Sequence, residues 1–226
     1  MTDLLAIETS GASCSVCLSI DGTRFTAIEH VDKRHNELLL GMLTDVRVRA
    51  GLSAQELMRA LDAVAFGCGP GSFTGVRIAA AAAQAIAFAS DARIVRVSSS
   101  AALAEKSLAD YSVRPRAAGV LTLIRSRADH YYVAAYRRSG PDFYCEQPDR
   151  LYPASPPADW YHSYAGWDMV GEQPGWWLGG PVSPLSADAV QVTDLGLRMF
   201  SRGEHVEAMD GLPEYLEGDS PWRKSS

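Results

Sequence analysis

The sequence predicts a mixed α/β fold, and three observations lead to that prediction. The chain begins with a short apolar run at 4–8 and two alternating stretches at 13–20 and 25–30, a pattern typical of β-strands. From His35 onward the hydrophobic period changes to that of a helix. Beyond residue 62, strand-like and helix-like stretches alternate, which favours sheets covered by helices over a helical bundle or a β-sandwich.

Local signals set the limits of the first elements. Asp21-Gly22 stands between two predicted strands and is a strong hairpin-turn signal. The long helix is expected to end at Gly51. Ser53, followed three residues later by Glu56, has the form of a capping box and opens a second, shorter helix.

The middle of the chain continues with alternating elements. The expected elements are a strand at 63–67, a helix at 74–89, a strand at 94–97, a helix at 101–109, and strands at 120–124 and 131–136. After Gly140, prolines and tryptophans become frequent. This half is therefore expected to be less regular, with loops, short strands and one helix within 184–200.

Composition and charge restrict the class of protein. A length of 226 residues allows one large domain or two small lobes. The formal net charge of -6 makes the chain a poor stand-alone binder of nucleic acid. The first residues lack the basic segment and cleavage site of a signal peptide, and the apolar run at 78–89 is too short to span a bilayer. We therefore expect a cytoplasmic protein without membrane attachment.

A glycine-rich stretch at 67–75 is the strongest candidate for chemistry. Glycines allow close backbone approach, and the helix that follows offers free N–H groups to an anion. Five residues are candidates for a phosphate-binding loop: Gly69, Gly71, Ser72, Thr74 and Gly75. The spacing nevertheless matches neither a P-loop nor a dinucleotide fingerprint, so a structural strand-to-helix turn is favoured over a phosphate cradle.

Other constellations of catalytic or metal-binding residues are weak. The five histidines include no pair four residues apart on a helix, and Cys14 and Cys17 lie on a predicted strand where residues three apart point to opposite faces. The carboxylates near predicted strand ends are Asp3, Glu8, Asp62, Asp129 and Asp168. Exposed acidic groups at such ends are ordinary, so the sequence predicts no catalytic residue, no metal site and no cofactor.

Several segments resemble the TsaB (YeaZ) family of bacterial tRNA threonylcarbamoyladenosine biosynthesis proteins. The likeness covers residues 4–104 and is most specific at Gly-Pro-Gly-Ser-Phe-Thr-Gly-Val-Arg-Ile, residues 69–78. It also includes Ile-Glu-Thr-Ser at 7–10, His-Asn at 35–36 and the late Leu-Pro-Glu-Tyr-Leu at 212–216. Two residues depart from the family pattern: Glu8 stands where an aspartate is usual, and Arg125 replaces a carboxylate.

The resemblance implies a fold and a set of partners. The fold would be actin-like (the ASKHA, ribonuclease H-like ATPase-domain fold), with an N-terminal lobe at 1–104 and a reduced C-terminal lobe at 105–226. The chain would be a non-catalytic scaffold that forms a heterodimer with the TsaD paralogue and works with the ATPase TsaE. It would form a homodimer in isolation and meet tRNA only through the complex.

The partner interface is expected on the helix after His35 and on the alanine-rich helix. Its expected residues are His35, Leu38, Leu39, Met42, Leu43, Val46, Val76, Arg77 and Ala80. The broad apolar stripe of the first helix exceeds one core-facing face, which favours this interpretation, although both helices could instead face only their own sheet. An active actin-like ATPase or phosphotransferase remains the alternative function, but Mg²⁺-binding carboxylates and a second glycine loop are not found in the later half.

Overall fold

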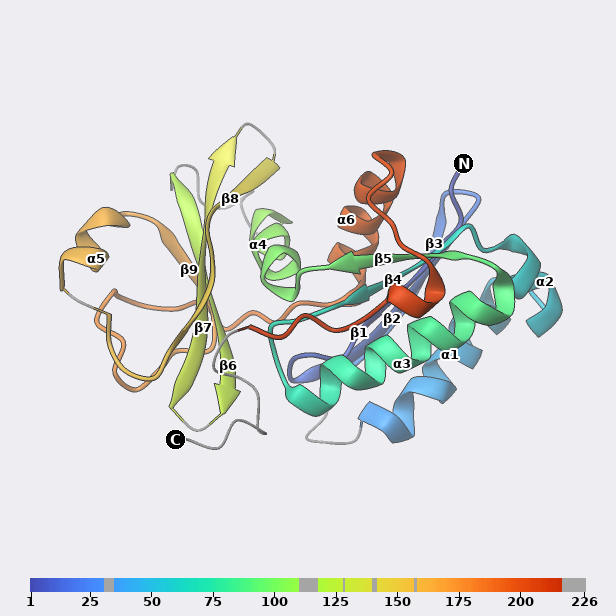
Figure 1. Cartoon of the computed structure of the whole chain (residues 1–226), viewed down its shortest axis with the longest axis horizontal. Helices are drawn as coiled ribbons and strands as arrows, with labels where there is room; N and C mark the ends of the chain where they lie inside the picture. Colours follow the sequence, from blue (N-terminus) through green and yellow to red (C-terminus); the bar gives the residue numbers. More distant parts are fainter. Residues whose placement is uncertain (31–34, 110–117, 128, 140–141, 157, 217–226) are drawn as a thin grey trace.

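Two lobes, each built on one β-sheet, make up the protein (Figure 1). The computed structural model describes residues 1–30, 35–109, 118–127, 129–139, 142–156 and 158–216. The first sheet has the order β3-β2-β1-β4-β5, and the second has the order β8-β7-β6-β9. Helix α4 (Ser99–Ala109) follows the last strand of the first sheet and leads toward the second.

The first sheet mixes antiparallel and parallel pairing. Its strands are β1 (Leu4–Glu8), β2 (Ser13–Ile20), β3 (Thr23–His30), β4 (Ala63–Gly67) and β5 (Arg93–Val97). The first three form a meander, whereas β1, β4 and β5 run parallel. The turn between β2 and β3 has positive φ at Asp21 and Gly22, as the hairpin signal predicts. The carboxyl ends of the three parallel strands therefore meet at one edge of the sheet.

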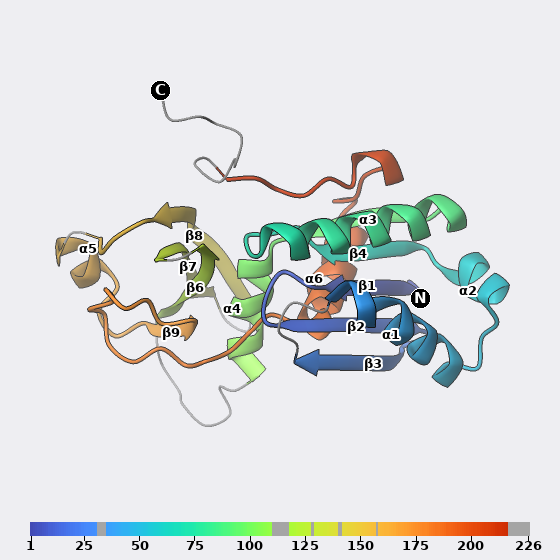
Figure 2. The same cartoon turned by 90° about the horizontal axis from the view of Figure 1, so that it is seen from below.

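Helices cover both faces of this sheet (Figure 2). One face carries α1 (His35–Arg49), α2 (Ala54–Ala60) and α3 (Phe73–Ser90), and the other carries α6 (Ala189–Ser201). Because side chains alternate along a strand, Cys14 joins the core under α1 and α3, and Cys17 joins the core under α6. The prediction that these two cysteines point to opposite faces is confirmed. The capping box at Ser53 and Glu56 is also confirmed.

The alanine-rich helix α3 packs closely on the sheet. The helix has 18 residues, more than the apolar run at 78–89, and a mean hydropathy of 1.3. By length and composition alone, it would suffice to cross a membrane. In the structure, Ala79, Ala80, Ala83 and Ala87 lie in the core between this helix and the sheet. Small side chains allow the helix to approach the strands closely.

The second sheet is more regular than the sequence predicts. Its strands are β6 (Gly119–Arg127), β7 (His130–Ser139), β8 (Asp142–Tyr152) and β9 (Asp168–Gly171), with the short helix α5 (Ala158–Ser163) between the last two. The sequence pattern misses β8, because register shifts opposite Val133, Ala135 and Tyr136 interrupt its alternation and because it contains Pro148. An edge strand tolerates proline, since one side of its backbone has no partner strand.

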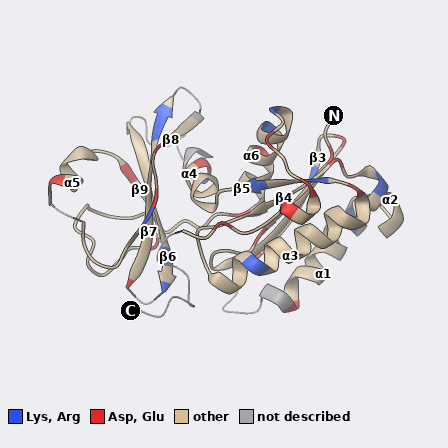
Figure 3. Ribbon diagram, viewed as in Figure 1, with Lys and Arg blue, Asp and Glu red and all other residues tan. Residues whose placement is uncertain are grey.

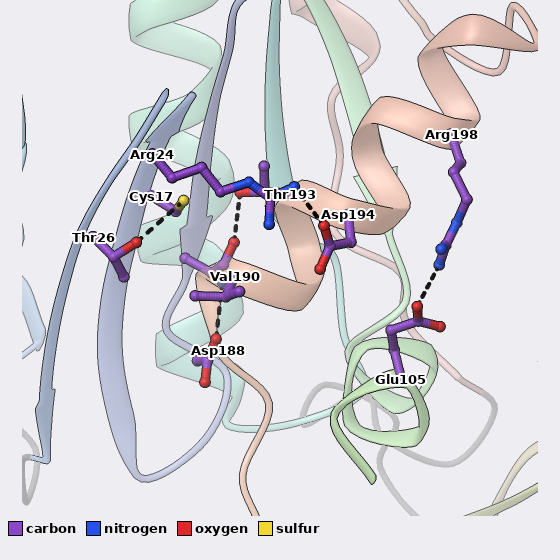
Figure 4. Close-up of polar contacts among 10 residues, drawn as sticks. Cys17, Arg24, Thr26, Glu105, Asp188, Val190, Thr193, Asp194 and Arg198 are labelled. Carbon is purple, nitrogen blue, oxygen red and sulfur yellow. Dashed lines mark hydrogen bonds and ion pairs between the residues drawn. The ribbon is translucent and has the colours of Figure 1, made fainter. Parts of the chain in front are cut away.

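Helix α6 returns to the first sheet, although it follows the second in sequence. Gly196 faces Ala65 of β4, and a side chain at this glycine would contact Ala65 at 2.9 Å, so the glycine serves close packing. At the flanks of α6, Arg24 pairs with Asp194 at 2.6 Å, and Arg198 pairs with Glu105 at 2.8 Å (Figure 4). Residues 189–201 therefore pack with the first lobe, which differs from the division at residue 104 that the sequence predicts.

We expect Leu39→Ala to lower the free energy of unfolding by about 2–5 kcal/mol, because this side chain is buried in the core under α1. The neighbouring Leu40 is 71% exposed, so Leu40→Ala should change it by less than about 0.5 kcal/mol. Urea unfolding of both variants measures the difference. Equal losses would contradict the orientation of α1.

Candidate functional site

The parallel strands β1, β4 and β5 end around the carboxyl group of Glu8. In open α/β sheets, ligands bind beyond the carboxyl ends of parallel strands, so this edge is where a site is expected. Glu8 is the last residue of β1 and is fully buried. Gly67 ends the adjacent strand β4, and a side chain there would overlap the carboxyl group of Glu8. The longer side chain of a glutamate thus fits because its neighbour has none.

The Glu8 carboxyl group is held entirely by residues of its own chain. The Ser10 N–H donates to its Oε1 at 2.5 Å, and the Ser99 hydroxyl donates to its Oε2 at 2.9 Å. The Ser10 hydroxyl in turn donates to the Ser99 oxygen at 3.0 Å. Burial raises the pKa of Glu8 above its ordinary value, and the hydrogen bonds from Ser10 and Ser99 oppose this rise. A carboxyl group binds Mg²⁺ in its ionised form, which burial disfavours here.

The glycine-rich loop wraps around the turn that follows β1. The Ser72 N–H donates to the Ser10 carbonyl oxygen at 2.7 Å, and the Thr9 hydroxyl donates to the Gly75 carbonyl at 2.7 Å. A Cβ at Gly71 would lie 2.5 Å from the Ser10 carbonyl oxygen. A Cβ at Gly75 would overlap the Thr9 carbonyl oxygen. These glycines therefore make room for the backbone of the chain itself.

Two backbone donors that a phosphate could use bond inside the chain instead. Besides the Ser72 N–H, the Gly75 N–H at the start of α3 bonds to the Ser72 hydroxyl at 3.3 Å. The inward-facing Ser10 carbonyl would repel an anion. Gly69 borders the C-terminal part of the chain, and Thr74 is exposed on the first turn of α3. This geometry supports the structural interpretation of the loop over the phosphate cradle.

A segment that the sequence does not predict covers this loop: residues 204–216, here called the C-terminal strap. It begins beside the edge strand β5, where Val206 and Ile94 exchange backbone hydrogen bonds of 2.9 and 2.8 Å. It then follows α3 (Figure 2) and reaches the loop, where the Glu214 N–H donates to the Cys68 carbonyl at 2.8 Å. The only sequence signal for it is the late motif at 212–216.

The residues expected at a partner interface fall into three groups. Leu39, Met42, Val46 and Ala80 are buried in the core of the first lobe, and Leu38 and Leu43 are partly buried against that core. Val76 is also buried. Arg77 is exposed, lies over the Phe73 ring and donates to the Tyr215 hydroxyl at 2.9 Å. The His35 side chain lies outside the described part of the structure. Most of the apolar stripe of α1 therefore faces its own sheet.

The outward faces of α1 and α3 carry three large apolar side chains that are not among the expected interface residues. Leu40 and Val48 of α1 are 71% and 58% exposed, and Phe88 of α3 is 79% exposed. Leu40 and Val48 are eight residues apart, two helical turns, so this spacing is a signal that could have identified them. An interface at these helices stays a prediction, with these residues as its surface.

The remaining sequence candidates do not converge on Glu8. Asp3 and Asp62 lie at the opposite end of the sheet, where each accepts a backbone hydrogen bond. Arg125 is exposed on β6 of the second lobe. Within the described ranges, no group of three histidine, cysteine or acidic side chains is placed to hold a metal ion. Basic and acidic residues are interspersed over both lobes (Figure 3).

Comparisons with known proteins agree with this architecture. Residues 29–149 match the family model of TsaD, described as tRNA N6-adenosine threonylcarbamoyltransferase. The chain is 28% identical to the tRNA threonylcarbamoyladenosine biosynthesis protein TsaB of Escherichia coli K12, over 98% of this chain and 97% of that protein. It is 38% identical to TsaB of Haemophilus influenzae, over 45% of this chain and 42% of that protein. The solved structure of YeaZ from Pseudomonas aeruginosa superposes with a TM-score of 0.79 at 31% identity, covering 96% of this chain and all of that one (100%).

The two sheets and these matches define the class as an actin-like (ASKHA-type) α/β protein, which confirms the predicted fold class. Within that class, the chain belongs to the TsaB (YeaZ) family. The family resemblance of the glycine-rich motif is thereby confirmed as well.

We expect Gly75→Ala to lower the free energy of unfolding by about 1–3 kcal/mol or more, because the new methyl group would overlap the Thr9 carbonyl oxygen. The control is Gly41→Ala on α1, where nothing lies within 4 Å and the substitution should stabilise by about 0.5–1 kcal/mol. Urea unfolding measures both. A neutral Gly75→Ala would refute the close packing of the loop.

The stability of the Glu8→Gln variant should increase relative to that of the wild type as pH rises. Because the folded state raises the pKa of Glu8, the stability that this group contributes is complete below its ordinary value of 4.5 and is lost at higher pH. Glutamine mimics the protonated form and removes this loss.

Unfolding midpoints of wild type and Glu8→Gln at about pH 5 and about pH 8 measure the effect. Glu56→Gln is the control with the opposite sign, because hydrogen bonds from Ser53 lower the pKa of the exposed Glu56. The stability that the ionised Glu56 contributes is therefore lost as pH falls. Parallel pH profiles for wild type and Glu8→Gln would contradict the prediction.

Proposed function

We propose that this chain takes part in forming threonylcarbamoyladenosine in tRNA as a non-catalytic partner of a TsaD paralogue, in the cytoplasm and together with the ATPase TsaE. The observation that carries this proposal is the filled edge of the first sheet. There, the buried Glu8 and the Ser10 carbonyl occupy the space beyond the strands where a nucleotide would need room and donors. The names of the TsaB relatives supply the pathway.

The outward faces of α1 and α3 support pairing with a paralogue of the same fold. Proteins that share a fold can pair through equivalent elements around a pseudo-two-fold axis, as homodimers do around an exact one. Leu40, Val48 and Phe88 offer apolar contacts on two helices that cover the same face of the sheet. The same surface would serve a homodimer of the isolated chain, so the paralogue and a second copy would compete for it.

The charge of the chain fits an indirect role toward tRNA. With a net charge of -6, the chain provides little of the electrostatic attraction on which nucleic-acid affinity depends. We therefore assign tRNA contact to the complex as a whole.

The test is sedimentation of the purified chain, alone and mixed with the TsaD paralogue of the same organism, with ATP turnover assayed on the same samples. We expect a homodimer that exchanges into a mixed complex and no turnover by the chain alone. The double variant Leu40→Asp/Val48→Asp should weaken both pairings about tenfold or more, because it places charges within an apolar contact.

Leu178→Asp is the matched control, because Leu178 is 77% exposed but lies in the second lobe. It should pair like the wild type. Equal pairing by the helix variant and this control would refute the interface. ATP turnover by the chain alone would refute the non-catalytic role and favour an active ATPase.

A further inference from the structure

Large apolar side chains are exposed where the C-terminal strap runs along α3. Met209 is 81% exposed, Leu212 and Tyr215 are each exposed by half or more, and Phe88 of the adjacent helix is 79% exposed. Isolated exposed apolar residues are common on protein surfaces, but several of them on neighbouring segments indicate an interaction surface. The strap and the outer face of α3 are therefore candidates for contact with another molecule.

The strap is held in place, although its apolar side chains are exposed. The Gln84 side-chain amide donates to the Met209 carbonyl oxygen at 3.3 Å. Further along the strap, Arg77 donates to the Tyr215 hydroxyl at 2.9 Å. Between these two contacts, a side chain at Gly211 would overlap a side chain of β5, so the strap backbone lies directly against this strand. A surface whose backbone is already fixed loses little conformational entropy on binding.

The strap continues the face that α1 and α3 form. Gln84 and Phe88 lie four residues apart, so both are on the same side of α3. Because Gln84 holds the strap at Met209, Phe88 and Met209 lie on neighbouring parts of one surface. Helix α3 contacts α1 on one side and the strap on the other (Figure 2). The surface proposed above for pairing with a paralogue thus extends from α1 across α3 to the strap.

The strap is acidic. Residues 204–216 include four carboxylates and no lysine or arginine. Arginines from outside the strap pair with Glu204 and Glu207. Among the described residues, none forms an ion pair with Asp210, which is exposed beside Met209. The apolar surface is therefore bordered by uncompensated negative charge.

Negative charge beside apolar side chains selects among partners. It fits a surface on which lysine or arginine surrounds apolar side chains, and it repels a surface of like charge. A second copy of this chain carries a net charge of -6. A second copy is therefore a less favourable partner for the strap than a protein with a cationic contact face.

We propose that the strap determines the specificity of pairing. It contacts the TsaD paralogue through Met209 and Leu212, with Asp210 facing lysine or arginine side chains of the paralogue, and it contributes little to a homodimer. This inference rests on the proposed function, because it concerns the same paralogue. It adds a difference between the two pairings: α1 and the outer face of α3 serve both, whereas the strap serves the mixed complex.

Sedimentation of the full chain, alone and titrated with the TsaD paralogue of the same organism, tests this inference. Asp210→Lys should weaken the mixed complex about tenfold or more, because it places a positive charge opposite cationic side chains, and it should not weaken the homodimer. Met209→Ser/Leu212→Ser should weaken the mixed complex by a similar factor. All three side chains are exposed, so these variants should keep the urea unfolding midpoint of the wild type.

Asp159→Lys and Leu178→Ser are the matched controls, because both residues are exposed in the second lobe. Both controls should bind the paralogue as the wild type does.

A mixed complex that forms normally with both strap variants, or a homodimer that they weaken as much as the mixed complex, would overturn the inference. Those results would leave the proposed function intact if Leu40→Asp/Val48→Asp still weakens both pairings. Absence of a mixed complex with the wild-type chain would refute the proposed function and this inference together.

Discussion

The close backbone packing between the turn after β1 and the glycine-rich loop is the constraint on which the rest of the structure depends. The carbonyl groups of Thr9 and Ser10 enter the loop where Gly71 and Gly75 have no side chains, and the Ser72 N–H bonds to one of them. This contact sets where α3 begins and how closely it lies against β1 and β4. Larger residues at these glycines would push the helix away from the sheet.

The same contact explains why a phosphate-like motif does not create a phosphate site. A helix N-terminus attracts anions only through N–H groups that are free. Here the Ser72 N–H bonds to the Ser10 carbonyl, the Gly75 N–H bonds to the Ser72 hydroxyl, and the Glu8 carboxyl group accepts from Ser10 and Ser99. The surfaces that remain for function include the outer faces of α1 and α3, the strap that borders α3 and a small cavity between the lobes beside Ser10 and Gly11.

The C-terminal strap adds a second layer of backbone over the glycine-rich loop. Its backbone covers the edge of β5 at Val206 and then the loop at Cys68, so the unpaired groups of an edge strand are partly satisfied within the chain. At its far end Glu214 lies beside Cys68 of the glycine-rich loop, and Glu214, Tyr215 and Leu216 line a small cavity with Tyr132 of the second lobe.

Local patterns in the sequence determined most of the first lobe. The hairpin at Asp21-Gly22, the capping box at Ser53 and the opposite faces of Cys14 and Cys17 depend on neighbouring residues, and the sequence predicts each of them. The glycine-rich motif likewise indicated the family. Only the tertiary structure decided which side of α1 is buried. The apolar residues of this helix lie on more than one face, and which of them are buried depends on where the sheet lies. Contacts between distant segments, such as α6 on β1 and Glu214 on Cys68, also required the folded chain, since no local pattern records which segments pack together.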